Sequence, residues 1–205
     1  MVLRKIRLPL TPSEARSLRL GELVLADGEA IITAGLPTHQ RIARALEDNA
    51  PLPLDLRGQA FFHMGLCAEE ANGALAPLYV NPTTSTRFAA HMPAMIRSFG
   101  LTAIAGKGGL DRASVDAMAD VGCVYLSMVG GASSILSGAV KSIVETGWDD
   151  LIMQFRLSRI QFEGLGPMAV AVDAHGASLY ADLAQAARRK LPAILAQLAA
   201  RRQER

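Results

Sequence analysis

The sequence predicts an α/β fold with a mixed sheet, and three observations support this. Strand-like segments at 101–105 and 123–129 are each followed by a loop and a helical pattern, an order typical of parallel strands with ligand loops at their carboxyl ends. Asp27-Gly28 lies between two apolar stretches and predicts an antiparallel hairpin. Helical periodicity from Ser178 to the C-terminus predicts a terminal helix.

The composition suits a single globular domain. Of the 205 residues, 50% are hydrophobic, which is enough to bury a substantial core. The 21 basic and 19 acidic residues give a net charge of only +2, without a basic run that could follow a nucleic-acid backbone. Aromatic residues make up 5%, too few for a base-stacking platform. We therefore expect no nucleic-acid partner.

The two cysteines and the N-terminal residues indicate whether this chain binds a metal and where in the cell it is expected. Cys67 and Cys123 are too few and too widely spaced for a metal site or a redox pair, so we expect this chain to bind no metal. Met1 to Arg7 is basic, but no apolar segment follows it as in a signal peptide. No stretch is long and apolar enough to span a bilayer. We expect a cytoplasmic location and no membrane contact.

Local signals predict the elements of the N-terminal half. Residues 11–14, Thr-Pro-Ser-Glu, form a capping box and predict a short helix that ends near Leu18. The elements expected after it are hairpin strands at 23–25 and 30–32, a helix at 38–49, a strand at 60–64 and a loop at 65–77.

In the C-terminal half, Pro93 falls within a helical pattern that ends near Phe99. A proline there removes a backbone N–H, so two short helical pieces are expected. The elements expected after it are a strand at 101–105, helices at 111–120 and 133–146, strands at 123–129, 153–162 and 168–172, and a helix at 178–205 kinked at Pro192.

The segment 81–87, Asn-Pro-Thr-Thr-Ser-Thr-Arg, predicts an anion site. It follows the strand-like residues 78–80 and opens the next helical pattern. Free N–H groups at a helix start, four hydroxyl side chains and Arg87 could converge on one carboxylate or phosphate. The alternative is that Thr83 or Thr84 only caps the helix, with Arg87 solvated.

Two further loops have a similar character. Residues 106–109, Gly-Lys-Gly-Gly, and residues 130–134, Gly-Gly-Ala-Ser-Ser, each follow a predicted strand. Their glycines let the backbone approach a ligand, and Lys107 adds a cation to Arg87. Each loop alone is equally consistent with a tight turn or a close packing point. Together they favour a small polyanion such as a dicarboxylate, since a P-loop and a dinucleotide GxGxxG are both absent.

Several motifs, taken in order, resemble a known family. They are Gly21-Glu22, the predicted hairpin leading to Thr33-Ala34, His39, Pro82 to Ser85 with Arg87, Gly106 to Gly109, Gly130 to Ala132, Asp173 and Gly176. This order resembles the beta-type domain of the iron-sulfur hydro-lyases, the class I fumarases and L-tartrate dehydratase. The similarity extends from about Leu8 to Leu183, and Pro-Thr-Thr-x-x-Arg with Gly-Lys-Gly is its most specific part.

The resemblance implies a swivelling β/β/α three-layer domain over residues 1–205, with an N-terminal arm and short helix at 1–20 and a terminal helix at 178–205. It also implies a hetero-oligomer in which this chain is the beta subunit, although the isolated chain could dimerise. An alpha-type subunit would carry a four-iron, four-sulfur cluster on three cysteines. The pair would reversibly hydrate or dehydrate a small dicarboxylate.

The resemblance also implies residue roles. Thr83 takes the position of the proposed catalytic base, and Lys107 that of an ammonium facing the substrate. A threonine hydroxyl is a poor base, so a cation such as Lys107 would have to stabilise its alkoxide. Arg87 takes the position of a residue that holds a substrate carboxylate. The other residues expected to bind substrate are Thr84, Ser85, Gly106, Gly108, Gly130, Gly131 and His39.

The sequence departs from the family pattern near the expected site. Gly35-Leu36 replaces the Arg-Asp of an Arg-Asp-x-x-His motif, which removes a cation directed at the substrate; Arg41 is a candidate for a displaced one. The other departures are Asn81 in place of glycine and Phe88-Ala89 in place of Met-Asp. Two alternatives therefore stay open: a divergent, non-catalytic module for anion binding or assembly, and a stand-alone, metal-free carboxylate or sugar-phosphate enzyme.

Overall fold

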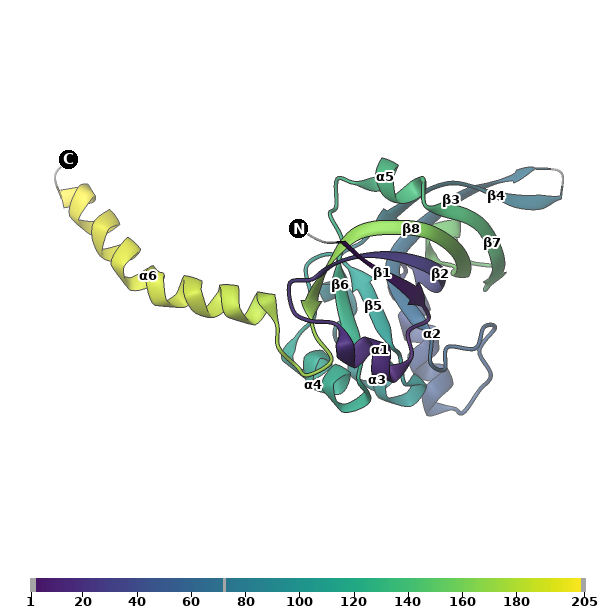
Figure 1. The fold of residues 1–205 in the computed structure, drawn as a ribbon, viewed down its shortest axis with the longest axis horizontal. Helices are drawn as coiled ribbons and strands as arrows, with labels where there is room; N and C mark the ends of the chain where they lie inside the picture. Colours follow the sequence, from purple (N-terminus) through teal and green to yellow (C-terminus); the bar gives the residue numbers. More distant parts are fainter. Residues whose placement is uncertain (1–2, 72, 204–205) are drawn as a thin grey trace.

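The computed structural model describes residues 3–71 and 73–203, and it confirms the α/β class (Figure 1). The strands are β1 (Leu3–Leu8), β2 (Leu23–Thr33), β3 (Ala60–Ala71), β4 (Ala74–Pro82), β5 (Ala103–Gly106), β6 (Val124–Ser127), β7 (Val140–Gly147) and β8 (Leu157–Val172). The helices are α1 (Pro12–Ser17), α2 (Leu36–Glu47), α3 (Met92–Phe99), α4 (Arg112–Val121), α5 (Ser133–Ser137) and α6 (Leu179–Gln203). Two 3₁₀ turns are η1 (Ser85–Phe88) and η2 (Met153–Phe155).

The strands form one mixed sheet in the order β1-β2-β3-β5-β6-β8-β7. Neighbours from β1 to β6 along this order are parallel, whereas β8 is antiparallel to β6 and β7. Because β8 also pairs with β2, the strands β2, β3, β5, β6 and β8 close into a ring. β4 pairs with β3 outside this ring, and the two form a hairpin that extends away from the body (Figure 1).

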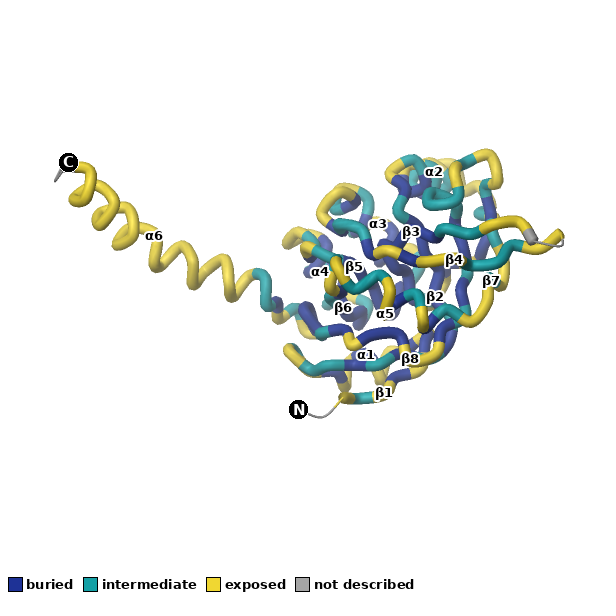
Figure 2. The backbone as a smooth tube through the Cα atoms, turned by 90° about the horizontal axis from the view of Figure 1, so that it is seen from above, coloured by how far each residue is buried: buried dark blue, intermediate teal, exposed yellow. Residues whose placement is uncertain are grey.

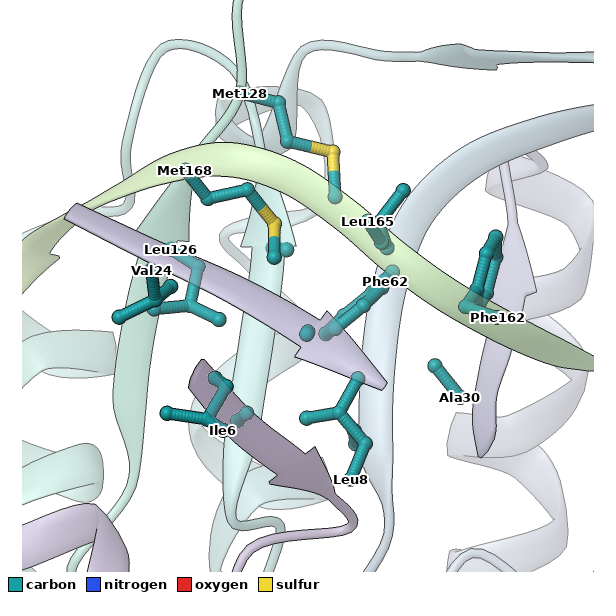
Figure 3. Packing of buried hydrophobic residues seen from close by; sticks show 14 of the residues in the cluster. Ile6, Leu8, Val24, Ala30, Phe62, Leu126, Met128, Phe162, Leu165 and Met168 are labelled. Atoms are coloured by element: carbon teal, nitrogen blue, oxygen red, sulfur yellow. The ribbon is translucent and has the colours of Figure 1, made fainter. Parts of the chain in front are cut away.

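Alternating side chains along the strands fill two cores. On β3, Phe62 and Met64 belong to the core enclosed by the strands; Phe62 lies there with Val24 and Phe162 (Figure 3). Phe61 belongs to a second core, which α2, α3 and α4 cover. The first core lies between two layers of strands, and the second lies between the strands and the helices. The layers therefore follow the order β/β/α.

β2 corrects the predicted hairpin, because the chain does not turn at Asp27-Gly28 but continues as one strand. β1 pairs in parallel with the first half of β2, with Leu8 opposite Gly28, and β8 lies on the other side. Gly28 has a φ of +108°, and a Cβ on it would collide with the Leu8 carbonyl oxygen. The glycine therefore allows two strands to approach closely.

Three further segments differ from the predicted elements. The expected loop at 65–77 is the hairpin of β3 and β4, and the second half of the expected helix at 133–146 is β7. The two strands expected on either side of Gly164 are the single strand β8. β7 pairs with β8, and β8 also pairs with the distant strands β2 and β6, which local propensity does not reveal.

Other predicted elements are confirmed. Thr11 caps α1 through a complete capping box, in which Glu14 accepts a hydrogen bond from the Thr11 N–H at 2.8 Å. Pro93 lies at the start of α3 and separates it from η1. The terminal helix is α6, with Pro192 inside it. No helix within residues 3–71 and 73–203 is long and apolar enough to cross a membrane.

His39 is fully buried in the helix-side core. Its ring stacks on Phe88 with centroids 4.0 Å apart, and its Nδ1 lies 2.7 Å from the Gly35 carbonyl oxygen. Because burial disfavours the imidazolium, the pKa of His39 falls to about 4. His39 is therefore neutral at physiological pH, and Nδ1 is the donor to Gly35.

A second buried polar group connects β3, η1 and β6. His63 Nδ1 lies 2.8 Å from Ser85 Oγ, which lies 2.7 Å from the hydroxyl of Tyr125. Burial lowers the pKa of His63 well below its usual value, and it raises the pKa of the Tyr125 hydroxyl. The three side chains form a neutral hydrogen-bonded chain that fixes η1 against the sheet.

We expect Gly28→Ala to lower the free energy of unfolding by about 2–4 kcal/mol, because the added methyl group meets the Leu8 carbonyl while φ stays positive. Gly58→Ala is the matched control: its φ is +67° but it faces open space, so it should cost about 1 kcal/mol. Urea unfolding measures both values. Equal losses would contradict close strand approach as the cause.

Acidification from pH of about 7.5 to about 5 should lower the free energy of unfolding by about 2 kcal/mol through His39 alone. The unfolded histidine takes up a proton near pH 6.5, whereas the buried ring does so only near pH 4, so stability falls as the pH drops between those values. Urea unfolding at a series of pH values checks this. His39→Asn should flatten the slope, whereas His175→Gln, at an exposed histidine, should not.

Candidate functional site

The candidate site is built where β4, β5 and β6 end. Thr83 and Thr84 follow β4, and Lys107 follows β5. The Thr83 N–H donates to the His63 carbonyl oxygen at 2.9 Å, and the Lys107 N–H donates to the Thr83 carbonyl oxygen at 3.0 Å. The Ser85 N–H donates to the Lys107 carbonyl oxygen at 2.8 Å. The second and third of these bonds join the loops after β4 and β5 and form the threonine-lysine clasp, whereas the first ties Thr83 to β3.

A cavity of about 220 Å³ opens beside the clasp. Its lining comes from the end of β2, the β3–β4 hairpin, η1, the loop after β5, and η2. The lining residues are Ala34, Gly65, Tyr79, Asn81, Pro82, Thr83, Thr84, Arg87, Lys107 and Gln154. The structure thus brings together four of the predicted residues, namely Thr83, Thr84, Arg87 and Lys107.

The lining of the cavity is cationic. Arg87 and Lys107 both line it, and no Asp or Glu is among the lining residues. Within residues 3–71 and 73–203, the carboxylates lie too far from Arg87 and Lys107 to form ion pairs with them. Two cations without a protein counter-ion make the cavity suited to an anionic ligand.

Glycines give the loops the room they need. A Cβ on Gly106 would collide with Ser85 Oγ, and one on Gly130 would lie 3.2 Å from Cδ of Lys107. Gly108 has a φ of +83° and lies against the Thr84 methyl group. These three predicted glycines therefore shape the cavity wall. Gly131 faces open space and touches none of these groups.

Two predicted substrate-binding residues lie elsewhere. Ser85 is fully buried, and its hydroxyl bonds to His63 and Tyr125. His39 is buried against Phe88, and neither Ser85 nor His39 lines the cavity. Both lie behind the site and support η1, the turn that carries Arg87.

Gln154 and Tyr79 also line the cavity, although neither belongs to a motif that predicted a site residue. Gln154 lies in η2, a turn inside a segment predicted as strand, and Tyr79 lies in β4. Polar residues in such positions carry no local signal of a site. The segment 130–134 orients Asn81, since Ser133 Oγ donates a hydrogen bond to Asn81 Oδ1 at 2.9 Å.

The structure explains the glycine at position 35. The backbone of η2 packs directly on this residue: a Cβ on Gly35 would lie 2.7 Å from the Phe155 Cβ, and the Ala34 N–H donates to the Gln154 carbonyl oxygen at 2.9 Å. An arginine at position 35 does not fit this packing. Gln154 therefore supplies a neutral amide on this side of the cavity.

Arg41 does not supply the displaced cation. Its guanidinium pairs with the Asp150 carboxylate, with Nη1 2.9 Å from Oδ1, and lies over the ring of Trp148. Arg41 is also absent from the lining of the cavity. The cations of the cavity remain Arg87 and Lys107.

The cysteines lie apart from the cavity lining. Cys67 is partly exposed on β3, whereas Cys123 is fully buried, and burial raises the pKa of the Cys123 thiol. Residues 3–71 and 73–203 contain no group of three or more His, Cys, Asp or Glu side chains that could hold a metal ion.

Comparison with known proteins agrees with the motifs. A proposed L(+)-tartrate dehydratase subunit beta of Methanocaldococcus jannaschii is 31% identical over 175 residues, covering 85% of this chain and 89% of that protein. The L(+)-tartrate dehydratase subunit beta of Escherichia coli is 26% identical over 174 residues, 85% of each protein. A proposed class I fumarate hydratase of Geobacillus stearothermophilus is 28% identical over 192 residues, covering 91% of this chain but only 35% of that protein.

The family profile described as Fumarase C-terminus matches residues 2–183. This range includes the threonine-lysine clasp, both cavity cations and the glycine loops, and it ends within the first turns of α6. The profile match and the similarity to the methanogen protein lead to the same conclusion: this chain belongs to the Fumarase C-terminus family.

Proposed function

We propose that this chain is the beta subunit of an iron-sulfur-dependent hydro-lyase that reversibly hydrates or dehydrates a small dicarboxylate. The observation that carries the proposal is the cavity beside the threonine-lysine clasp, where Arg87 and Lys107 form no ion pair with a carboxylate of residues 3–71 or 73–203. Family membership and the names of the relatives, fumarate hydratase and tartrate dehydratase subunit beta, support the reaction class.

Arg87 is the proposed carboxylate clamp. A guanidinium presents paired N–H donors that match the two oxygens of a carboxylate, and η1 fixes the backbone that carries it. Thr84 lines the same cavity and would help to orient the ligand. Fixing one carboxylate determines which carbon of the substrate faces the clasp.

Thr83 and Lys107 are the proposed proton-transfer pair. Dehydration removes a proton from the carbon next to a carboxylate as the hydroxyl leaves from the neighbouring carbon, and hydration reverses both events. The Thr83 alkoxide would take that proton and become a neutral hydroxyl, which returns the proton in hydration, and the Lys107 ammonium would stabilise the alkoxide before the transfer. The clasp holds the backbones of the two residues in register for this exchange.

The proposed partner is an alpha-type subunit that carries a four-iron, four-sulfur cluster. When bound, the cluster supplies a Lewis-acidic iron for the leaving hydroxyl. The beta subunits among the relatives support such a partner, and the class I fumarate hydratase, in which this chain spans about a third of the length, supports a fused equivalent.

Gln154 is the proposed determinant of substrate choice. It lines the cavity in the turn that packs on Gly35, the position where the family pattern has an arginine, and its amide can both donate and accept hydrogen bonds. A neutral amide favours a hydroxyl or carbonyl group on the substrate over a second fully clamped carboxylate. The preferred substrate should therefore differ from malate at this end.

Thr83→Ala and Lys107→Ala should each lower kcat by about 100-fold or more, because each removes one member of the proton-transfer pair. Arg87→Ala should mainly raise KM, by about tenfold or more, through loss of the clamp. The measurement is turnover of a dicarboxylate panel by the complex purified anaerobically with its alpha-type subunit. The control is Lys141→Ala, which removes an exposed lysine of β7 that pairs with Glu163 of β8 and does not line the cavity.

The outcome discriminates between the proposed functions. Loss of turnover in Thr83→Ala and Lys107→Ala, with the iron content unchanged, supports the hydro-lyase. A complex with an intact cluster that turns over no member of the panel favours the non-catalytic module. Activity of this chain alone, in a metal-free preparation, would favour the stand-alone enzyme.

Gln154→Glu should raise KM for every dicarboxylate by about tenfold, because it adds a carboxylate to a cavity that binds anions. Gln154→Arg should shift the ratio of kcat/KM values toward malate and tartrate, since it restores a cation on that side. Steady-state kinetics with the same panel measures both effects. An unchanged substrate ratio in both variants would show that Gln154 does not face the substrate.

A further inference from the structure

The terminal helix α6 extends away from the body of the protein (Figure 1). Every residue from Ala181 to Arg202 is exposed, so the helix has no partner along its length within the described chain (Figure 2). The large apolar side chains from Leu183 to Leu198 are between 47% and 68% exposed. Most of this helix also lies beyond residue 183, where the match to the family profile ends. The shared domain therefore does not account for α6.

Five apolar side chains of α6 form a narrow seam that ends before Arg201, the next position of the repeat. They recur with alternating steps of three and four residues, the spacing of the a and d positions of a coiled coil. The seam consists of Ala184, Ala187, Leu191, Ile194 and Leu198, with Leu183 and Leu195 on its flanks. Pro192 lies outside the seam, at a position that would not face a packed neighbour. A helix that buries this seam needs another helix beside it.

Basic residues occupy three of the six e and g positions between Leu183 and Arg202, and the other three are Leu183, Leu195 and Gln197. Arg188 and Arg202 take e positions and Lys190 takes a g position, and these are the positions that set partner choice in coiled coils. Asp182, at the start of the helix, is the acidic residue in the described part of α6. The basic side chains that border the seam therefore match an acidic neighbour.

The base of α6 is fixed to the body. The Tyr180 hydroxyl donates to Ser127 Oγ at 2.9 Å, and the ring lies so close to Gly109 that a Cβ there would clash with it. Gly109 ends the loop that carries Lys107. The helix thus leaves the protein from an anchored first turn, which presents the seam in a defined direction.

Two other occupants fit the helix less well. A second copy of α6 would offer only the same cations at the borders of the seam, so opposite charges would not meet. A membrane surface suits broader apolar faces that include Trp or Phe, whereas this seam is narrow, has alanine at two of its five positions and contains neither residue. The pattern favours a helix with acidic borders.

We propose that α6 is a docking helix for a partner protein that presents an amphipathic helix with acidic residues beside its apolar seam. Burial of Leu191, Ile194 and Leu198 would supply the binding free energy, and Arg188, Lys190 and Arg202 would select the partner by charge. The inference does not depend on the hydro-lyase activity, since it concerns only residues outside the candidate site.

The test uses the full chain and a four-heptad synthetic peptide with Leu at a and d and Glu at e and g. A second peptide, identical but with Lys at e and g, is the control. Fluorescence anisotropy should show that the chain binds the acidic peptide at least about tenfold more tightly than the basic one, and that added salt weakens the binding.

Matched variants assign the binding to the seam. Ile194→Glu should weaken binding of the acidic peptide about tenfold or more, whereas Ala196→Glu, which adds the same charge on the opposite face, should change it less than about threefold. Both residues are exposed, and circular dichroism verifies that the helix persists.

Three results would overturn the proposal. The first is equal binding of the two peptides, or equal effects of the two variants. The second is concentration-dependent self-association that Ile194→Glu abolishes, without peptide binding, which would assign the seam to a second copy. The third is tighter binding to phosphatidylglycerol vesicles than to the acidic peptide, which would assign α6 to an anionic membrane.

Discussion

The threonine-lysine clasp is the constraint on which the candidate site depends. Thr83 and Lys107 follow the consecutive strands β4 and β5, and two backbone hydrogen bonds hold their loops side by side. Because backbone bonds set the geometry, the side chains of both residues are free to face the cavity. A loop held in this way costs little conformational entropy when a ligand binds, which favours a preorganised anion site.

The buried layer behind the clasp serves the same purpose. Ser85 and His39 resemble ligand-binding residues in the sequence, yet both are fully buried and line no part of the cavity. Ser85 connects His63 to Tyr125, and His39 stacks on Phe88, so η1 is held from both of its ends. Residues of a recognisable motif can thus act one layer away from the ligand, by fixing the turn that carries Arg87.

Much of the fold and part of the site could be predicted from the sequence. The capping box at Thr11, the break at Pro93 and the helices predicted at 38–49 and 111–120 depend on local signals, and the structure contains them, the two helices as α2 and α4. The hairpin predicted at Asp27-Gly28 was wrong because β2 pairs with β1 through these residues. A pattern of neighbouring residues does not reveal this pairing between separate segments. Gln154 could not be found, since it reaches the cavity only through the packing of η2 on Gly35.

The closed ring of strands has a consequence for how the chain folds. β2 is the second strand of this domain and β8 is its last described strand, yet Ala30 of β2 pairs with Ile160 of β8. The enclosed core therefore cannot be completed until nearly the whole domain has left the ribosome. Such a topology, dominated by contacts between distant parts of the chain, folds slowly and leaves apolar strand edges exposed in the meantime.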